Sequence, residues 1–220
     1  MKTEQAANER PLMVDVAFHI TGGPVPLDHG YPLFGALCRA LGDDLHSAGW
    51  LAVHPLRGAP SGTGKLTLRP GALLVLRIDQ ERIGSVLPLC GKSLEIAGSR
   101  VQVGVPRIEM LRPATSLVAR TVTFKHHLAP ETFLPHLLEE LRRLEVRADV
   151  ELGRRRIVTI GGDKVVGFGL SLSGLEHQDA LRLQERGLGG RRHFGCGVFV
   201  PAPPRTRRAP STAKPSGESA

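Results

Sequence analysis

The chain has 220 residues, of which 41% are hydrophobic, and this is enough to build one large domain or two small ones around an aliphatic core. A formal net charge of +8 indicates a polyanionic partner such as RNA, DNA or an acidic membrane surface. The three cysteines do not have the spacing of a zinc site, and their odd number argues against a fully disulfide-bonded secreted scaffold. No apolar run approaches the roughly 20 residues of a membrane span. We therefore expect a cytoplasmic protein with reduced thiols.

The first half of the chain predicts one β-α-β-β-α-β unit. Alternating and β-branched residues predict a strand over 12–20, and Leu33, Leu37 and Leu41 share one face of a helix predicted over 31–46. The other elements expected here are strands at 50–56, 65–78 and 100–109 and a short helix near 80–89.

The second half repeats this order of elements without repeating the sequence. Pro130 suits the first position of a helix, and Gly161 and Gly162 form a turn between two alternating runs. The expected elements are strands at 116–125, 149–160, 164–172 and 194–200 and helices at 130–144 and 175–184.

These elements predict an α+β fold of two tandem ferredoxin-like units, joined near Pro113. The units span 12–112 and 113–200, between a flexible N-terminus at 1–11 and a disordered basic tail at 201–220. Split sheets of this kind often present an open face to RNA. Only 4% of the residues are aromatic, so contacts to the RNA backbone and to its shape must provide more of the affinity than base stacking.

The segment 187–199, near the C-terminal end of the second unit, is rich in glycine and contains two adjacent arginines. Glycine allows positive φ and lets backbone N–H groups approach an anion closely. Arg191 and Arg192 would add charge-assisted hydrogen bonds to phosphate. The glycines of this loop are Gly187, Gly189, Gly190, Gly195 and Gly197. Nucleotide-binding motifs lead into a helix, but a strand-like run follows this loop, so we expect it to bind a phosphate polymer and not a single nucleotide. The alternative is a tight turn with solvated arginines.

A second basic cluster, Arg154, Arg155 and Arg156, begins a predicted strand. Strand alternation would place Arg154 and Arg156 on one face and Arg155 on the other. With Lys164 and the two loop arginines, the cluster could form a stripe against an RNA hairpin stem, or it could be ordinary solvated surface. Phosphate contacts would make binding weaken steeply with salt, whereas a solvated face would not.

Four segments together resemble the CRISPR-associated endoribonucleases of the repeat-associated RNA-binding protein superfamily, most closely the myxobacterial-type branch. They are the loop at 187–197, the run 28–33 that leads into the first helix, Leu45 with His46, and 164–169. The resemblance covers 12–200. It implies cleavage of CRISPR repeat RNA in a precursor transcript, without metal or cofactor, by attack of the 2′-hydroxyl. The products would be guide RNAs with 5′-hydroxyl and 2′,3′-cyclic phosphate ends.

Such a reaction needs a base for the 2′-hydroxyl, an acid for the leaving oxygen and cationic support for the phosphorane. Histidine suits both proton transfers because its ordinary pKa is close to neutral pH. The resemblance places the family's acid or base at His46, which is our first candidate, with a helix C-terminal cap as the alternative. His29 and Tyr31, at the start of the same helix, are further catalytic candidates, and a packing role for His29 is equally open.

Most of the other histidines fit structural or solvated positions. These are His19, His126, His127, His136 and His177, while His54, just before Pro55, is a weaker candidate for chemistry. The cation that would support the transition state is left open among Lys65, Lys125 and an arginine.

Two other classes of function are compatible with the sequence. A non-catalytic RNA-binding scaffold subunit of a CRISPR effector complex would bind repeat RNA without cutting it, and other effector subunits would be its partners. A basic interaction protein for DNA or an acidic partner is suggested by the charge and the tail alone. A preference for DNA would count against a mechanism whose nucleophile is the 2′-hydroxyl.

Overall fold

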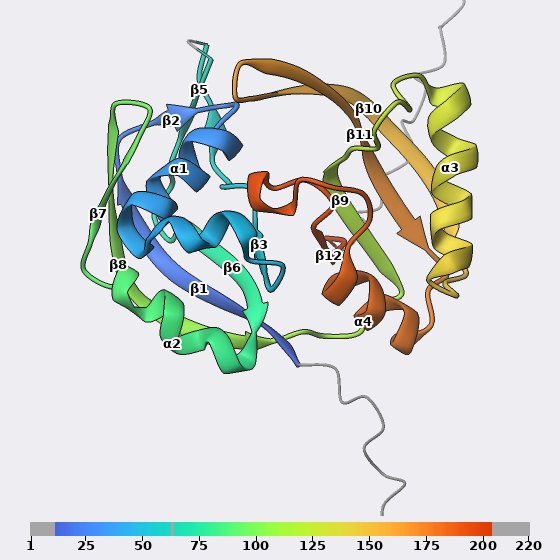
Figure 1. Ribbon diagram of the computed structural model, residues 1–220, viewed down its shortest axis with the longest axis horizontal. Helices are drawn as coiled ribbons and strands as arrows, with labels where there is room; N and C mark the ends of the chain where they lie inside the picture. Colours follow the sequence, from blue (N-terminus) through green and yellow to red (C-terminus); the bar gives the residue numbers. More distant parts are fainter. Residues whose placement is uncertain (1–11, 63, 204–220) are drawn as a thin grey trace, which may run out of the picture.

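The computed structural model describes residues 12–62 and 64–203, which form two units of sheet and helix lying side by side (Figure 1). The strands of the first unit extend to Met110, and those of the second begin at Ser116. The expected flexible segment at 1–11 and most of the expected tail, 204–220, lie outside the described residues. The prediction of a disordered tail from 201 is wrong for its first two residues, because Pro201 belongs to the last strand and the N–H of Ala202 donates to the carbonyl oxygen of Ser116 at 3.0 Å. None of the helices described is both long and apolar enough to cross a membrane.

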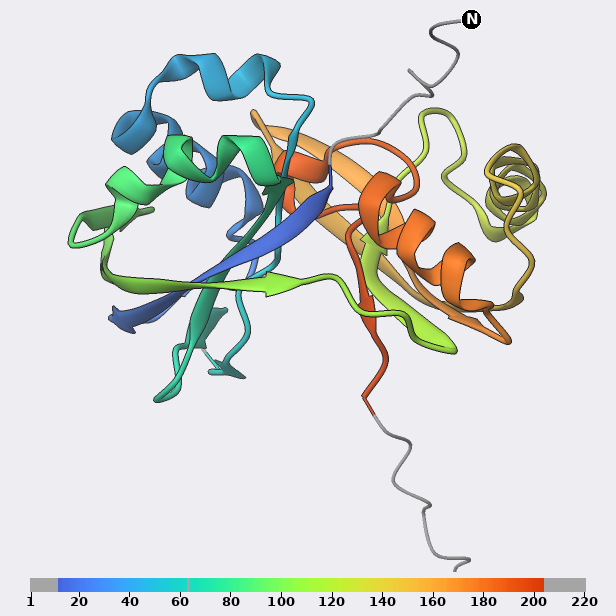
Figure 2. The ribbon, with the colours of Figure 1, turned by 90° about the horizontal axis from the view of Figure 1, so that it is seen from below.

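The first unit is a five-stranded antiparallel sheet in the order β3-β6-β1-β8-β7, with α1 and α2 on one face (Figure 2). Its strands are β1 (Met13–Gly22), β3 (Leu51–Val53), β6 (Leu73–Asp79), β7 (Ser93–Ile96) and β8 (Ser99–Met110). Its helices are α1 (Gly30–Leu41), α2 (Ile83–Val86) and the 3-10 helices η1 (Asp43–Ser47), η2 (Gln80–Arg82) and η3 (Leu87–Leu89). A small side sheet, β2-β5-β4, consists of β2 (Val25–Pro26), β4 (Ala59–Pro60) and β5 (Lys65–Thr67).

The core of the first unit follows from two periodicities. Alternate residues of β1, such as Val16 and Phe18, are fully buried on one side of the sheet. Leu33 and Leu37, one helical turn apart on α1, are buried in the same cluster. The helix face that the sequence predicts is therefore the face that packs.

The second unit is a four-stranded antiparallel sheet in the order β10-β11-β9-β12. Its elements are β9 (Ser116–Val122), α3 (Pro130–Arg143), β10 (Asp149–Ile160), β11 (Asp163–Ser173), α4 (His177–Arg186), the 3-10 helix η4 (Arg192–Phe194) and β12 (Phe199–Pro201). Its core joins Phe133 and Leu137 of α3 and Leu183 of α4 to buried residues of the sheet. The predicted α+β class is confirmed, and the strand order of both sheets is consistent with two ferredoxin-like units.

One predicted helix ends early, and one predicted strand is divided in two. The helix expected over 31–46 ends at Leu41, because Gly42 has a positive φ of 112°, and the chain continues into η1, which carries His46. The strand expected over 65–78 is divided into β5 and β6, since Pro70 between them has no N–H to donate to a sheet.

The end of the second unit also differs from the prediction. The strand expected over 194–200 is only β12, because the preceding residues form η4 and a tight turn. β7 was not predicted, and it pairs with the first residues of β8 across a short turn. Both differences concern short elements whose conformation depends on neighbouring parts of the fold.

The β10–β11 hairpin connects the two units. It arches from the second sheet across to the first unit, on the side of α1 and β2 (Figure 1). Near its tip, the backbone N–H of Thr159 donates a 2.6 Å hydrogen bond to Oδ2 of Asp28, which lies just before α1. The hairpin and the segment preceding α1 are thereby fixed together, although they are far apart in the sequence.

Candidate functional site

The glycine-rich loop packs directly against the start of α1. Gly30 is the first residue of α1, and a Cβ at this position would overlap the carbonyl oxygen of Phe194. The ring of Phe194 also lies 5.7 Å from that of Tyr31, whose residue is 45% exposed. The close approach of loop and helix therefore requires a glycine at position 30, and it leaves the tyrosine accessible to a ligand.

Phe34 of α1 organises a group of rings at this contact. The ring of His193 stacks parallel to Phe34 with centroids 4.8 Å apart, and His46 meets the same ring edge-on at 5.2 Å. Phe194 also packs edge-on, at 5.4 Å. We call Tyr31, Phe34, His46, His193 and Phe194 the aromatic cluster. It unites α1, η1 and η4, and so brings imidazoles from both units to one side chain.

The two histidines of the aromatic cluster differ in how they are held. His46 is exposed on η1. His193 is half-buried, and its Nε2–H donates a 2.8 Å hydrogen bond to the carbonyl oxygen of Ala48, so that Nδ1 is the nitrogen with a lone pair. An exposed imidazole and an oriented imidazole at one surface are suited to proton transfer.

His29 is placed differently, inside the protein. It is 3% exposed; its Nδ1–H donates to the carbonyl oxygen of Pro26 at 3.0 Å, and Nε2 accepts the N–H of Leu56 at 2.9 Å. Burial lowers the pKa of the imidazole more than the Pro26 carbonyl raises it. A neutral ring with both nitrogens bonded to backbone fits the packing alternative better than a proton-transfer role.

Most backbone amides of the loop are used within the fold, contrary to the prediction that its glycines present bare N–H groups to an anion. The amides that donate to carbonyl oxygens are those of Gly187, Leu188, Gly190, Phe194, Gly195, Cys196 and Gly197. The N–H of Gly197, for example, donates to Thr121 of β9 at 2.8 Å. The amides of Gly190 and Gly197 attach the loop to the end of β9, and the others close turns within the loop or end α4.

The loop closes on itself at two glycines. Gly187 and Gly197 both have a φ of 67°, and a Cβ on either would overlap a carbonyl oxygen of the other strand of the loop, that of Gly197 or of Leu188. Gly189 would likewise meet the carbonyl oxygen of Thr123, whereas a Cβ on Gly190 would meet no described atom within 4 Å. Close backbone packing is the reason for most of the loop's glycines.

The side chains of the two loop arginines have different partners. Arg191 is partly exposed, with Nη1 3.5 Å from the hydroxyl of Thr123. Arg192 folds back so that Nη2 donates to the carbonyl oxygen of Glu185 at 2.8 Å, and its buried Nε has no hydrogen-bond partner among the described residues. Burial and the nearby Arg77 lower the pKa of Arg192 to about 10. The structure therefore turns Arg192 away from the pairing with phosphate that the sequence predicts.

The three arginines of β10 are all exposed on the hairpin. A register shift lies between Leu152 and Arg155, so simple alternation does not hold across Arg154. Arg155 stands opposite the buried Phe168 and Arg156 opposite Gly167, which places these two on different faces as predicted. Lys164 pairs with Thr159 near the tip of the hairpin and is exposed as well.

Arg156 lines a cavity of about 280 Å³ between the two units together with two arginines that the sequence analysis missed. These are Arg57, which follows β3, and Arg120 of β9. The position of Arg120 within a predicted strand gave no sign that its side chain meets another unit. His193 was overlooked although it lies in the loop already singled out, because its stacking on Phe34 appears only in the folded chain.

The other candidates for a supporting cation, Lys65 of β5 and Lys125 after β9, are exposed. Within 12–62 and 64–203, no three His, Cys, Asp or Glu side chains are grouped so that they could hold a metal ion.

Solved structures share this architecture and define the class of α+β fold to which the chain belongs. A structure described as that of a Cas6-related gene from Pyrococcus furiosus aligns with a TM-score of 0.63 at 13% identity, covering 86% of this chain and 98% of that one. Thermus thermophilus Cse3, bound to an RNA representing a pre-cleavage complex, aligns with a TM-score of 0.50 at 16% identity, covering 87% of this chain and 100% of that one. At these identities the similarity shows the fold.

Sequence comparison identifies the family. A family model described as Cas6 Crispr matches residues 14–203. A CRISPR-associated endonuclease Cas6 from Myxococcus xanthus (strain DK1622) is 46% identical over 203 residues, which are 92% of this chain and 87% of that protein. The chain belongs to the Cas6 family of CRISPR-associated endonucleases, and the resemblance seen in its sequence is confirmed.

Proposed function

We propose that this protein is a metal-independent endoribonuclease that binds CRISPR repeat RNA and cuts the precursor transcript into guide RNAs. The observation that carries the proposal is the aromatic cluster, where Phe34 contacts both His46 and His193, and the exposed Tyr31 contacts Phe194. The similarity to the Myxococcus enzyme supports the substrate class.

In the proposed reaction the 2′-hydroxyl attacks the adjacent phosphorus. The O2′–P bond forms as the P–O5′ bond breaks, a base takes the proton of the 2′-hydroxyl, and an acid gives a proton to O5′. His46 provides one of these transfers, and Nδ1 of His193, whose Nε2 is bound to Ala48, provides the other. Tyr31 donates its hydroxyl hydrogen to the phosphate, and His29 shapes the backbone before α1.

The RNA would lie across both units, which we propose to be ferredoxin-like domains at 12–112 and 113–200. Arg154, Arg155, Arg156 and Lys164 on the hairpin would contact backbone phosphates, as would Arg191 in the loop. The loop glycines Gly187, Gly189, Gly190, Gly195 and Gly197 would give the loop its shape, and Arg192 would hold it to α4.

The test is cleavage of a repeat RNA in the presence of a chelator, followed on a denaturing gel. We expect cutting by the wild-type protein and none when the scissile ribose lacks its 2′-hydroxyl. His46→Ala should slow cutting by about a hundredfold or more, the typical contribution of a general acid or base, with RNA affinity retained. His177→Ala, at an exposed histidine that begins α4, is the matched control.

Binding without any cutting by the wild-type protein would contradict this proposal. It would favour the non-catalytic scaffold subunit, with other effector subunits as partners. Equal binding of DNA and RNA would contradict recognition of a ribose polymer and favour the basic interaction protein.

A further inference from the structure

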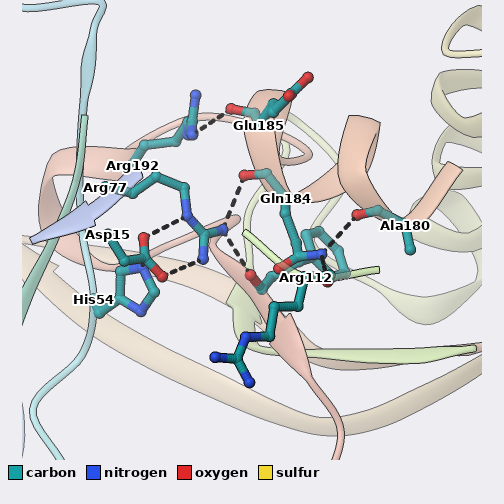
Figure 3. Close-up of polar contacts among 9 residues, drawn as sticks. Asp15, His54, Arg77, Arg112, Ala180, Gln184, Glu185 and Arg192 are labelled. Carbon is teal, nitrogen blue, oxygen red and sulfur yellow. Dashed lines mark hydrogen bonds and ion pairs between the residues drawn. The ribbon is translucent and has the colours of Figure 1, made fainter. Parts of the chain in front are cut away.

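Arg77 of β6 is a charged side chain buried at the boundary between the two units. Its residue is 1% exposed. Its Nε and Nη2 donate to the two carboxylate oxygens of Asp15 on β1, at 2.8 and 2.9 Å. Its Nη1 reaches the second unit and donates to the carbonyl oxygens of Gln184 at 2.9 Å and Phe199 at 2.7 Å (Figure 3). One guanidinium group therefore joins three elements from two units.

The partners of Asp15 favour its charged form. Burial by itself raises the pKa of the Asp15 carboxyl, but contacts with His54 and Arg77 outweigh it and hold that pKa well below its usual range. Nε2 of His54 lies 3.4 Å from Oδ1 of Asp15. A buried ion pair is seldom more stabilising than apolar packing of the same volume, so stability alone does not explain this arrangement.

The two carbonyl groups that Arg77 binds bracket the glycine-rich loop. Gln184 lies in the last turn of α4, just before Gly187, and Phe199 begins β12, just after Gly197. The amide of Gln184 also donates to the carbonyl oxygen of Arg112 in the segment that joins the units, at 2.8 Å (Figure 3). Both ends of the loop are thus attached to the first sheet through a single side chain.

The aromatic cluster crosses the same boundary as the Arg77 hydrogen bonds. His193 and Phe194 come from the loop, whereas Tyr31, Phe34 and His46 belong to the first unit. A shift of the loop along α1 would carry His193 away from Phe34 and His46, which both belong to the first unit. We propose that Arg77, oriented by Asp15, is a positioning residue that sets the loop against α1 for the cleavage reaction; this inference rests on the proposed function.

The decisive variant is Arg77→Lys. A lysine keeps a charge for Asp15, but its single ammonium group cannot form the same fork and also reach both carbonyl groups of the second unit. We expect the single-turnover cutting rate to fall by about tenfold to a hundredfold, because small misplacements of reacting groups have effects of this size, while RNA affinity stays within about threefold. Arg142→Lys, at an exposed ion pair with Glu139 on α3, is the matched control and should cut normally.

A readout without RNA separates failure of this inference from failure of the proposed function. Hydrogen exchange of the amides at 187–197 should be faster in Arg77→Lys than in the wild-type or Arg142→Lys proteins. If the wild-type protein cuts no repeat RNA, the proposed function fails. Unchanged hydrogen exchange of the loop amides in Arg77→Lys would then overturn the positioning role as well. If the wild-type protein cuts, an Arg77→Lys protein with wild-type cutting and exchange overturns the inference alone.

Should Arg77→Lys fail to fold, the double variant Asp15→Leu with Arg77→Met replaces it. Exchanging a buried ion pair for apolar side chains of similar volume is often tolerated, and it removes the bonds to both carbonyl groups. The same slow cutting, near-normal RNA affinity and faster loop exchange are expected. Normal cutting by this folded variant would equally overturn the positioning role.

Discussion

Hydrogen bonds to the neighbouring backbone determine whether the imidazole of His29 can take up a proton. The neighbourhood of Tyr31 made His29 a reasonable catalytic candidate, but the ring connects Pro26 to Leu56 beneath the surface. Accepting a proton there would break the hydrogen bond that Nε2 receives from Leu56, and burial already disfavours the charged form. Sequence spacing located the right region of the chain, while burial, which spacing cannot show, distinguishes His29 from His46.

Because the pKa of His29 is lowered in the folded state, its effect on stability has a definite sign. As the pH falls through the ordinary histidine pKa of about 6.5, the unfolded chain takes up a proton that the folded protein does not. The free energy of unfolding should therefore be highest at neutral pH and above, and decrease as the pH falls from about 7 to 5. Urea denaturation at several pH values measures this slope, to which the buried His54 contributes in the same direction.

His29→Gln should make the pH dependence shallower, even if it lowers stability at every pH. His177→Gln, at an exposed position, should leave the slope as in the wild-type protein. An unchanged slope in His29→Gln would show that this ring is not held neutral in the folded protein.

At the scale of elements, α1 and the glycine-rich loop are parts of one assembly although most of the chain separates them. The sequence predicts the buried face of α1 correctly from its leucine spacing, and it points to the loop. It does not predict that the loop's amides bind acceptors within the protein, because some acceptors, such as Thr121 of β9, are distant in sequence, and the others depend on how the loop itself turns. Short 3-10 turns and the register shift in β10 were missed for the same reason.

Two glycines of α1 test this packing directly. Gly30→Ala places a methyl group onto the carbonyl oxygen of Phe194, so the loop must move away from the helix. We expect lower stability and slower cutting. At Gly35 the nearest atom to a new Cβ is the end of the flexible Arg39 side chain, at 3.5 Å, so Gly35→Ala should raise stability by up to about 1 kcal/mol through helix propensity.

Chemical denaturation and single-turnover cleavage of both variants measure the difference. The two substitutions add the same group to the same helix, so each is the other's control. Equal stability of the two variants would contradict the close contact between Gly30 and the loop.

For the whole molecule, the contacts at the boundary between the units join residues that are far apart in the sequence. Arg77 lies 62 residues from Asp15 and 107 from Gln184, and no local pattern in the sequence relates these positions. Two sheets were therefore predictable from the order of elements, whereas their mutual attachment was not. The missed residues Arg57, Arg120 and His193 all act across this boundary.

This attachment predicts that the two units unfold together. The single tryptophan, Trp50, lies in the first unit, while far-ultraviolet circular dichroism reports on both. Urea unfolding followed by both signals should give the same midpoint, the sign of one cooperative transition. In Arg77→Lys the two midpoints should separate. Distinct midpoints in the wild-type protein would mean that the units are energetically independent.

The Thr159–Asp28 contact and the Arg77 bonds fasten the two sheets at two places. The packing of His193 and Phe194 against α1 adds a third contact, which opposes rotation about the line joining the other two. A nucleic acid would then bind a preformed surface. The protein would lose little conformational entropy upon association. Discrimination between correct and incorrect hairpins would then come from how well the RNA fits this surface.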